Sequence, residues 1–417
     1  MVERFFRKAQ VRRRLQEGPL AGVVRGYLGH LEERGYSTFT IHQYVQAAEH
    51  FGRWLTRSGR TVVHADGTLV EKFLARHLPR CRCRAPRSRT TYCVRAALHQ
   101  LLAAIGMDRR RLCQGASRGA IDTVVDDFER HLTDTCGAAA ATRRYYLREA
   151  RAFLAMQFGD GPVDLASVTA AAAREFVTMR GKALTPASTN VVVTAVRSFG
   201  RFLQLKGISG AWTAAVPRAA DWRLARIPRV LTDEEVDALL AAFDRTRAHG
   251  RRDYGIALCL IGLGLRASEV AGLTLADVDW RSGILTLRAG KTRRESRLPL
   301  PARVARALAD YLRHGRPKTS DRALFVNHRP PRGRRIGPAV VRSAIRLAYA
   351  RANLDPRLTG THVLRHTAAT RLLRAGVSMK EIADVLGHRS LDTSAIYAKV
   401  DLPALAAVAL PWPGVRS

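Results

Sequence analysis

Hydrophobic periodicity is the feature of this 417-residue chain that most restricts its fold. Apolar residues recur every three or four positions through long segments, which is the spacing of one face of an α-helix. These segments are 20–30, 39–56, 140–157, 188–206, 234–244, 338–350 and 364–375. Strand-like alternation is confined to 283–288 and 297–300, which flank a polar turn, and an apolar run at 323–326 is a further candidate strand. We therefore predict a mainly α fold with a small antiparallel β-sheet.

A weak internal repeat divides the first half of the chain. Tyr44 precedes Phe51 by seven residues, and Tyr146 precedes Phe153 by the same interval, so each pair lies on one helical face. A second and a third amphipathic helix follow in each case, near Phe73 and 91–105, and near Phe176 and 188–206. We predict two helical repeats, 1–118 and 119–210, although two unrelated amphipathic helices would give the same pattern by chance.

A change in composition separates these repeats from the rest of the chain. Residues 211–228 have little periodicity and contain Pro217 and Pro228, which is typical of a linker. Thr232 and Glu235 then fit a capping box, in which each side chain accepts a backbone N–H of the other residue at the start of a helix. We place the C-terminal domain at 229–417.

The charge balance indicates a polyanionic partner. The chain has 70 Lys and Arg against 35 Asp and Glu, a net charge of +35. Nucleic acid is the natural counterpart of such an excess. A membrane surface is the alternative, but the basic residues are spread over the whole chain, and no apolar run is long enough to span a bilayer. Six cysteines and no secretory h-region predict a cytoplasmic protein, associated with the nucleoid in a bacterium.

Four separated segments of the C-terminal domain carry the residues suited to chemistry. They are Gly262–Val270, a hairpin with Lys291 at its tip, Thr361–Thr367, and Leu386–Tyr397. Arginine presents a planar fork that matches two phosphate oxygens. Lysine or histidine can protonate a leaving alkoxide, and tyrosine becomes a nucleophile when its proton is removed. His362, Arg365 and His366 share one face if their segment is helical. Such a set is suited to phosphoryl transfer to tyrosine.

In kind and order, these residues resemble the tyrosine recombinase (phage integrase) family. The matching set is Arg266, Lys291, His362, Arg365, His388 and Tyr397. The resemblance covers about 229–400 and implies an α+β catalytic domain. The first-half repeats are more loosely similar to the helical, SAM-like core-binding domain of that family, present here twice.

The resemblance implies a role for each residue. Tyr397 attacks the scissile phosphate and forms a 3′-phosphotyrosine, while Arg266 and Arg365 bind the non-bridging oxygens. Lys291 is the general acid for the 5′-oxygen, His362 assists proton movement at Tyr397, and His388 hydrogen-bonds the phosphate. The remaining matches, Glu269 and His366, support the site structurally. The covalent link conserves the phosphodiester energy, so neither a metal nor ATP is required.

The resemblance also implies partners. Double-stranded DNA is bound by this chain, with four protomers, or related recombinases, in a synapse, and no small-molecule substrate is expected. An N-terminal part longer than that of a minimal Xer-type resolvase favours a mobile-element integrase or transposase. A type IB topoisomerase, which would relax DNA without a preferred site, and a non-catalytic DNA-binding protein are the alternatives. The tail, 401–417, forms a short apolar helix that docks on a neighbouring subunit or packs on its own domain.

The cysteines of the first repeat allow two interpretations. Cys81 and Cys83 lie close to His77, with Cys93 and Cys113 downstream, and Cys and His at such spacing can bind zinc. A Cys-x-Cys pair lacks the usual two-residue spacer, however, and no second tight pair follows. We therefore expect buried or incidental thiols here, with no metal and no cofactor in the protein.

Overall fold

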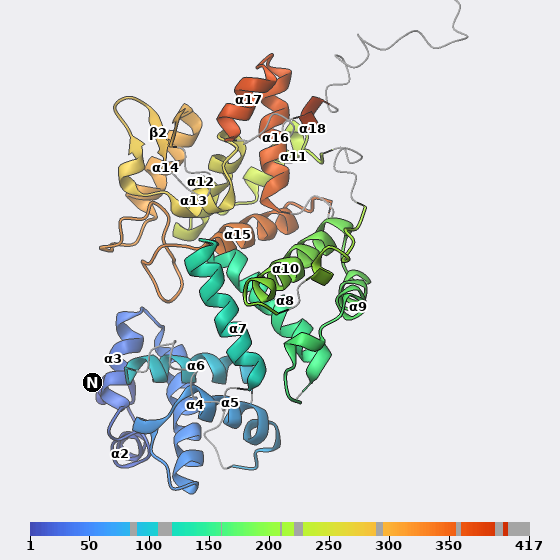
Figure 1. The fold of residues 1–417 in the computed structure, drawn as a ribbon. Coiled ribbons are helices and arrows are strands. Elements are labelled where there is room, and N and C mark those ends of the chain that lie inside the picture. Colours follow the sequence, from blue (N-terminus) through green and yellow to red (C-terminus); the bar gives the residue numbers. More distant parts are fainter. Residues whose placement is uncertain are drawn as a thin grey trace, which may run out of the picture. The chain divides into compact units, whose positions relative to one another are not determined.

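The computed structural model describes residues 1–83, 90–106, 119–159, 161–208, 211–220, 228–288, 295–355, 360–387 and 395–398 (Figure 1). The chain divides into two compact units. The first comprises Met1–Glu32 and Ser37–Trp222, and the second comprises Glu33–Tyr36 and Arg223–Ser417. Among the described residues, no helix combines the length and the apolar character that crossing a membrane requires.

The described part of the first predicted repeat consists of helices joined by short turns and loops, and it contains no β-strand. Its helices are α1 (Val2–Phe5), α2 (Ala9–Glu17), α3 (Val24–Glu33), α4 (Thr38–Arg57), α5 (Gly67–Lys72), the π-helical turn η2 (Phe73–His77) and α6 (Thr91–Ala104). The long helix α4 begins where the Ser37 side chain accepts the backbone N–H of Thr40. It packs along α6, and the Tyr27 hydroxyl ties α3 to α6 by donating to the Ala97 carbonyl at 2.8 Å.

The second predicted repeat has its own core. It is built from α7 (Ala120–Arg130), α8 (Ala140–Phe158), α9 (Ala170–Gly181) and α10 (Pro186–Leu205). One fully buried phenylalanine comes from each helix, namely Phe128, Phe153, Phe176 and Phe199. The paired positions of the internal repeat behave alike, since Phe51 and Phe153 are both fully buried while Tyr44 and Tyr146 are half-buried.

The start of the predicted linker packs on this core. Trp212 and Val216 belong to the same hydrophobic cluster as the four phenylalanines. A Cβ atom added to Gly200 on α10 would lie 2.1 Å from Thr213 and 2.8 Å from the Trp212 ring, so only glycine permits this approach. The first residues of the predicted linker therefore belong to the packed core of the second repeat.

The second unit surrounds a buried central helix. It contains α11 (Asp233–Ala241), α12 (Ala248–Gly262), α13 (Ala267–Gly272), α14 (Ala302–His314), α15 (Pro338–Arg351), α16 (Thr361–Arg374), α17 (Met379–Leu386) and α18 (Ala395–Ala398). Helix α12 packs against α14, α15 and α16, and its last turns are buried on every side. The capping box of Thr232 and Glu235 that the sequence predicts is present at the start of α11.

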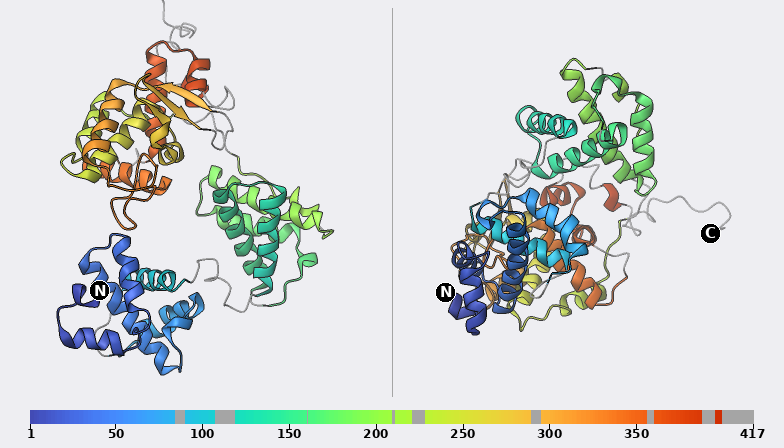
Figure 2. Two further views of the ribbon diagram at one scale, coloured as in Figure 1. Left: turned by 90° about the vertical axis from the view of Figure 1, so that its left-hand side faces the viewer. Right: turned by 90° about the horizontal axis from the view of Figure 1, so that it is seen from below.

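A three-stranded antiparallel sheet completes this unit (Figure 2). Its strands are β1 (Val278–Asp279), β2 (Ile284–Leu287) and β3 (Ser296–Pro299), with β2 in the centre. The register pairs Leu285 with both Val278 and Leu298, and all three side chains face the core. The predicted hairpin is thus formed by β2 and β3.

The third strand is not the one that the sequence suggested. Residues 323–326 form only isolated bridges, between Thr274 and Ala323 and between Val326 and Arg335. They are buried on both sides, and Phe325 stacks on Tyr311 of α14 at 5.7 Å between ring centroids. A short run in which every residue is apolar can be buried in the core either as a strand or as a loop. Such a run has no alternation of apolar and polar residues, so the sequence could not distinguish the two.

Candidate active site

A tight turn after α12 places Arg266. Gly264 has φ of +62°, and a Cβ atom there would lie 2.5 Å from the Leu386 side chain, so a larger residue is excluded. Arg266 follows as the N-cap of α13. The Glu269 carboxylate accepts hydrogen bonds from the backbone N–H and from the guanidinium Nη1–H of Arg266, each at 2.7 Å. Nη2 of Arg266 donates to the Gly387 carbonyl at 3.3 Å. Glu269 thus holds both the backbone and the guanidinium of Arg266.

The second arginine is held by backbone carbonyls. Arg365 lies on α16 and is 5 % exposed. Its Nη1 donates to the Gly264 carbonyl at 2.6 Å and its Nη2 to the Leu386 carbonyl. Burial, reinforced by the neighbouring Arg266 charge, lowers the pKa of Arg365 to about 10, so it stays charged at neutral pH. The guanidinium joins the turn before α13, the helix α16 and the end of α17 at one point.

Tyr397 lies beside α16. The short helix α18 packs on α16, and the Tyr397 ring is buried in a small apolar cluster with Ala369, Ile382 and Leu386. Its hydroxyl lies 3.0 Å from Nδ1 of His366. Burial is the main effect on Tyr397 and raises its pKa, while the Arg365 and Arg266 charges lower it in part. The phenol is therefore neutral at pH 7, and the cationic pocket moderates the cost of ionising it.

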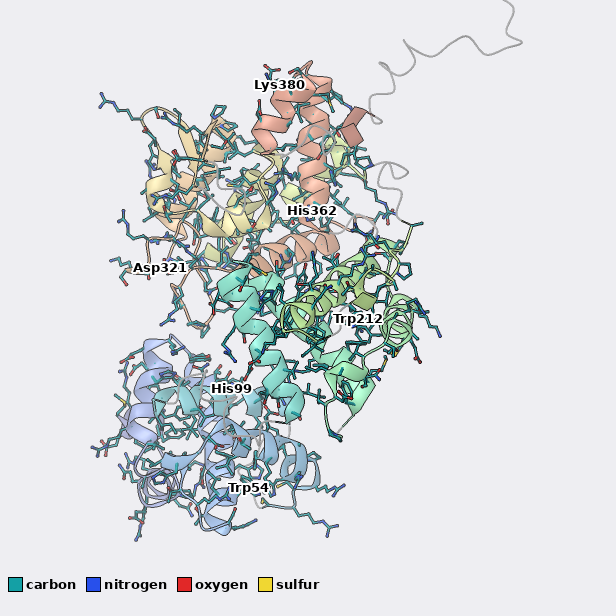
Figure 3. All side chains as sticks on the ribbon, viewed as in Figure 1. Trp54, His99, Trp212, Asp321, His362 and Lys380 are labelled. Carbon is teal, nitrogen blue, oxygen red and sulfur yellow. The ribbon has the colours of Figure 1, made fainter. Side chains whose placement is uncertain are left out.

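Two histidines of α16 belong to the candidate site. Burial, with His362 and Arg365 nearby, lowers the pKa of His366 to about 4, so its ring is neutral and can accept the Tyr397 proton in a hydrogen bond. His362 lies one turn earlier on α16 (Figure 3), and partial burial and three arginines lower its pKa as well. The family resemblance implies proton movement for His362 and structural support for His366, and the structure places His366 next to the phenol. The i, i+4 spacing put both on one face and could not tell which of them Tyr397 approaches.

The described residues thus bring four predicted side chains to one place, namely Arg266, Arg365, His366 and Tyr397, with Glu269 behind them and His362 adjacent on α16. Lys291, His388 and the tail 401–417 lie outside the described residues. Within those residues, one group of Cys and His side chains could hold a metal ion, and it belongs to the first repeat rather than to this site.

Comparison with known proteins decides the family. The phage integrase family model matches residues 229–402, and the model of the phage integrase N-terminal SAM-like domain matches 125–207. The y4rA protein of Sinorhizobium fredii, which is named as an integrase/recombinase, is 37 % identical over 402 residues, covering 95 % of this chain and 96 % of y4rA. The chain belongs to the phage integrase, or tyrosine recombinase, family. It is thereby a member of a DNA breaking-and-rejoining class of enzymes.

Other relatives match part of the length of this tyrosine recombinase. Tyrosine recombinase XerC of Oceanobacillus iheyensis is 30 % identical over 290 residues, which covers 67 % of this chain and 92 % of XerC. Among solved structures, XerH bound to palindromic difH covers 81 % of this chain and 93 % of its own, with 18 % identity and a TM-score of 0.54. The Tn1549 transposon integrase covers 68 % and 99 %, with 19 % identity and a TM-score of 0.52. These likenesses confirm the fold, including the SAM-like helical domain.

Proposed function

We propose that this recombinase cleaves and rejoins duplex DNA at specific sites through a covalent 3′-phosphotyrosine at Tyr397. The observation that carries the proposal is the joint placement of the Tyr397 hydroxyl, 3.0 Å from His366, and of two arginines fixed to Gly264, Leu386 and Gly387. Preorganised cations next to a buried phenol are the arrangement that phosphoryl transfer to tyrosine needs. Attack forms the phosphorus–tyrosine bond and releases a 5′-hydroxyl.

The two arginines balance the charge of the transferred phosphate. Each guanidinium has five N–H groups, and only some of them are used by the protein contacts described above, so others remain for the non-bridging oxygens. Lys291 protonates the leaving 5′-oxygen and His388 binds the phosphate, as the family resemblance implies. Fixed cations meet the developing charge, so the reaction proceeds without a catalytic metal or ATP.

His366 is the first acceptor within reach of the phenolic proton. Its hydrogen bond orients Tyr397 for attack. A phosphate held between Arg266 and Arg365 adds negative charge beside the imidazole, and this raises the pKa of His366 from its low value toward the range in which it can take the proton. His362, one turn away on α16, assists the transfer.

Chain length supports a mobile-element role. The y4rA relative matches 95 % of this chain, whereas XerC matches 67 % and leaves about a third of it outside the alignment. We propose that the protein is an integrase or transposase in which repeats 1–118 and 119–210 hold duplex DNA together with the catalytic domain 229–417. The net charge of +35 supplies the electrostatic attraction, and four protomers form the synapse on the nucleoid.

Covalent trapping tests the proposal. Purified protein is incubated, without added metal or ATP, with nicked suicide duplexes that carry the ends of its host element. A denaturation-resistant adduct that mass spectrometry maps to Tyr397 is the expected result, and Tyr397→Phe should bind the duplex equally well but form none. Tyr349→Phe is the matched control, since this tyrosine is also buried, in the same unit but outside the site. An adduct that persists in Tyr397→Phe would overturn the assignment of the nucleophile.

A further inference from the structure

The first helical repeat brings two histidines and two cysteines together. One ligand atom from each of His50, His77, Cys81 and Cys83 lies within 4.8 Å of every other. His50 comes from the middle of α4, His77 ends the turn η2, and the two cysteines follow directly. Two of the six separations are given by direct contacts, since His50 Nε2 lies 3.1 Å from Cys81 Sγ and His77 Nε2 lies 3.6 Å from Cys83 Sγ.

These separations can be compared with those around a tetrahedral zinc ion. With Zn–S of about 2.3 Å and Zn–N of about 2.0–2.1 Å, the edges of the tetrahedron are about 3.3–3.8 Å long. The His77–Cys83 separation of 3.6 Å already equals such an edge, and the His50–Cys81 separation of 3.1 Å is a few tenths of an ångström shorter. Small rotations of the side chains would therefore place all four atoms around one ion.

The surroundings of the four side chains are those of a supported site. His50 is 1 % exposed, Cys81 6 % and Cys83 9 %. The backbone N–H of Cys83 donates to Cys81 Sγ, and Arg57 Nη1 donates to Cys83 Sγ, each at 3.3 Å, and such hydrogen bonds stabilise thiolates. Phe73 stacks on the His77 ring at 5.1 Å and meets the His50 ring edge-on at 5.1 Å, which fixes both imidazoles.

We propose that His50, His77, Cys81 and Cys83 bind one zinc ion. Four protein ligands complete the tetrahedron and leave no open position, so the site is structural rather than catalytic. It would fasten the middle of α4 to the segment after η2, and its binding energy would stabilise the first repeat. The ion is separate from the phosphoryl-transfer chemistry of Tyr397.

This inference revises the expectation of incidental thiols. His77, Cys81 and Cys83 are close in the sequence, but the fourth ligand, His50, lies on a preceding helix and could not be recognised from spacing. Cys93, which the sequence also offered, is not a member of the group that the described residues form.

Metal analysis of the full-length protein tests the site. The protein is purified under reducing conditions without a metal-affinity step, and its zinc content is measured by inductively coupled plasma mass spectrometry. We expect one zinc ion per chain. After chelation, Co²⁺ should give the intense visible absorption of a tetrahedral site with thiolate ligands.

Single substitutions distinguish the site from ordinary buried polar contacts. Loss of a hydrogen bond that supports a ligand lowers metal affinity by about 10- to 100-fold. Loss of the ligand itself, in Cys81→Ser or His77→Gln, should weaken zinc binding by at least that factor. His77 is partly exposed, so His77→Gln is informative even if Cys81→Ser does not fold. Cys136→Ser is the matched control, because Cys136 also lies beside a histidine, His131 at 3.4 Å, but belongs to no group of three or more ligands among the described residues.

Three results would overturn the proposal. One is a folded, reduced protein that binds neither Zn²⁺ nor Co²⁺ stoichiometrically. Another is a zinc affinity, measured by competition with a chelator, that is unchanged in His77→Gln or that falls equally in Cys136→Ser. The third is a Cys81–Cys83 disulfide, detected by mass spectrometry of protein alkylated directly from fresh lysate.

Discussion

Replacement of Arg365 by lysine tests both the scaffold and the chemistry of the site. Arg365 spans two backbone carbonyls, those of Gly264 and Leu386, from a position that is 5 % exposed. Lysine keeps the positive charge, but its compact ammonium cannot reproduce the planar fork that joins two acceptors at fixed separation. The substitution therefore removes geometry while it retains charge.

The expected size of each effect follows from these contacts. A buried carbonyl that loses its donor costs about 1–3 kcal/mol in the free energy of unfolding. For a domain of the size of 229–417, this lowers the melting temperature by about 2–12 °C. Loss of one preorganised donor to the phosphate lowers the cleavage rate by about 10²–10³-fold. Arg365→Lys should show both effects, whereas DNA affinity should change little.

Calorimetry of the full chain and single-turnover cleavage of a suicide duplex measure the two effects. Arg371→Lys is the matched control on the same helix, because the Arg371 guanidinium donates to the exposed Asp233 carboxylate, and such surface pairs contribute about 0–1 kcal/mol. If Arg365→Lys cleaves DNA as fast as Arg371→Lys does, Arg365 does not bind the phosphate. An unchanged melting temperature would refute the claim that it fastens the turn at Gly264 to the end of α17.

Three further outcomes are expected. His366→Asn keeps a hydrogen-bond acceptor near the Tyr397 hydroxyl, but asparagine cannot take the phenolic proton. The rate of single-turnover cleavage should therefore fall by about 10²-fold or more, while DNA affinity is retained. A wild-type cleavage rate would mean that His366 only positions Tyr397. Because burial lowers the pKa of both His366 and His328 to about 4, the unfolded chain binds protons that the folded chain rejects, and stability should be lost as the pH falls from 6.5 toward 4. His366→Asn should reduce that slope in denaturant titrations at several pH values, and an equal slope would contradict the assigned pKa. Deletion of 1–118 should weaken site-specific binding in gel-shift assays while the remainder still folds, and unchanged affinity would remove the first repeat from DNA recognition.

Local patterns were sufficient for most of the secondary structure. The apolar stripes that predicted helices at 39–56, 140–157 and 338–350 correspond to α4, α8 and α15, with ends that differ by at most one residue. The same reasoning was insufficient at 323–326, because these residues are buried on both sides and their apolar side chains do not alternate with polar ones. It also did not reveal that Trp212 and Val216, in the predicted linker, pack on the core of the second repeat, because the residues that they contact are distant in the sequence.

The sequence by itself determined the family and the candidate residues of the active site, because residue types and their order along the chain are properties that no folding step alters. Only the tertiary structure decided which side chains meet. Helical spacing puts His362 and His366 on one face of α16, but the approach of α18 selects His366 as the partner of Tyr397. In the same way, packing of α4 against the segment after η2 brings His50 to Cys81. Contacts between distant segments depend on how helices dock, and this is set by the whole core rather than by any local pattern.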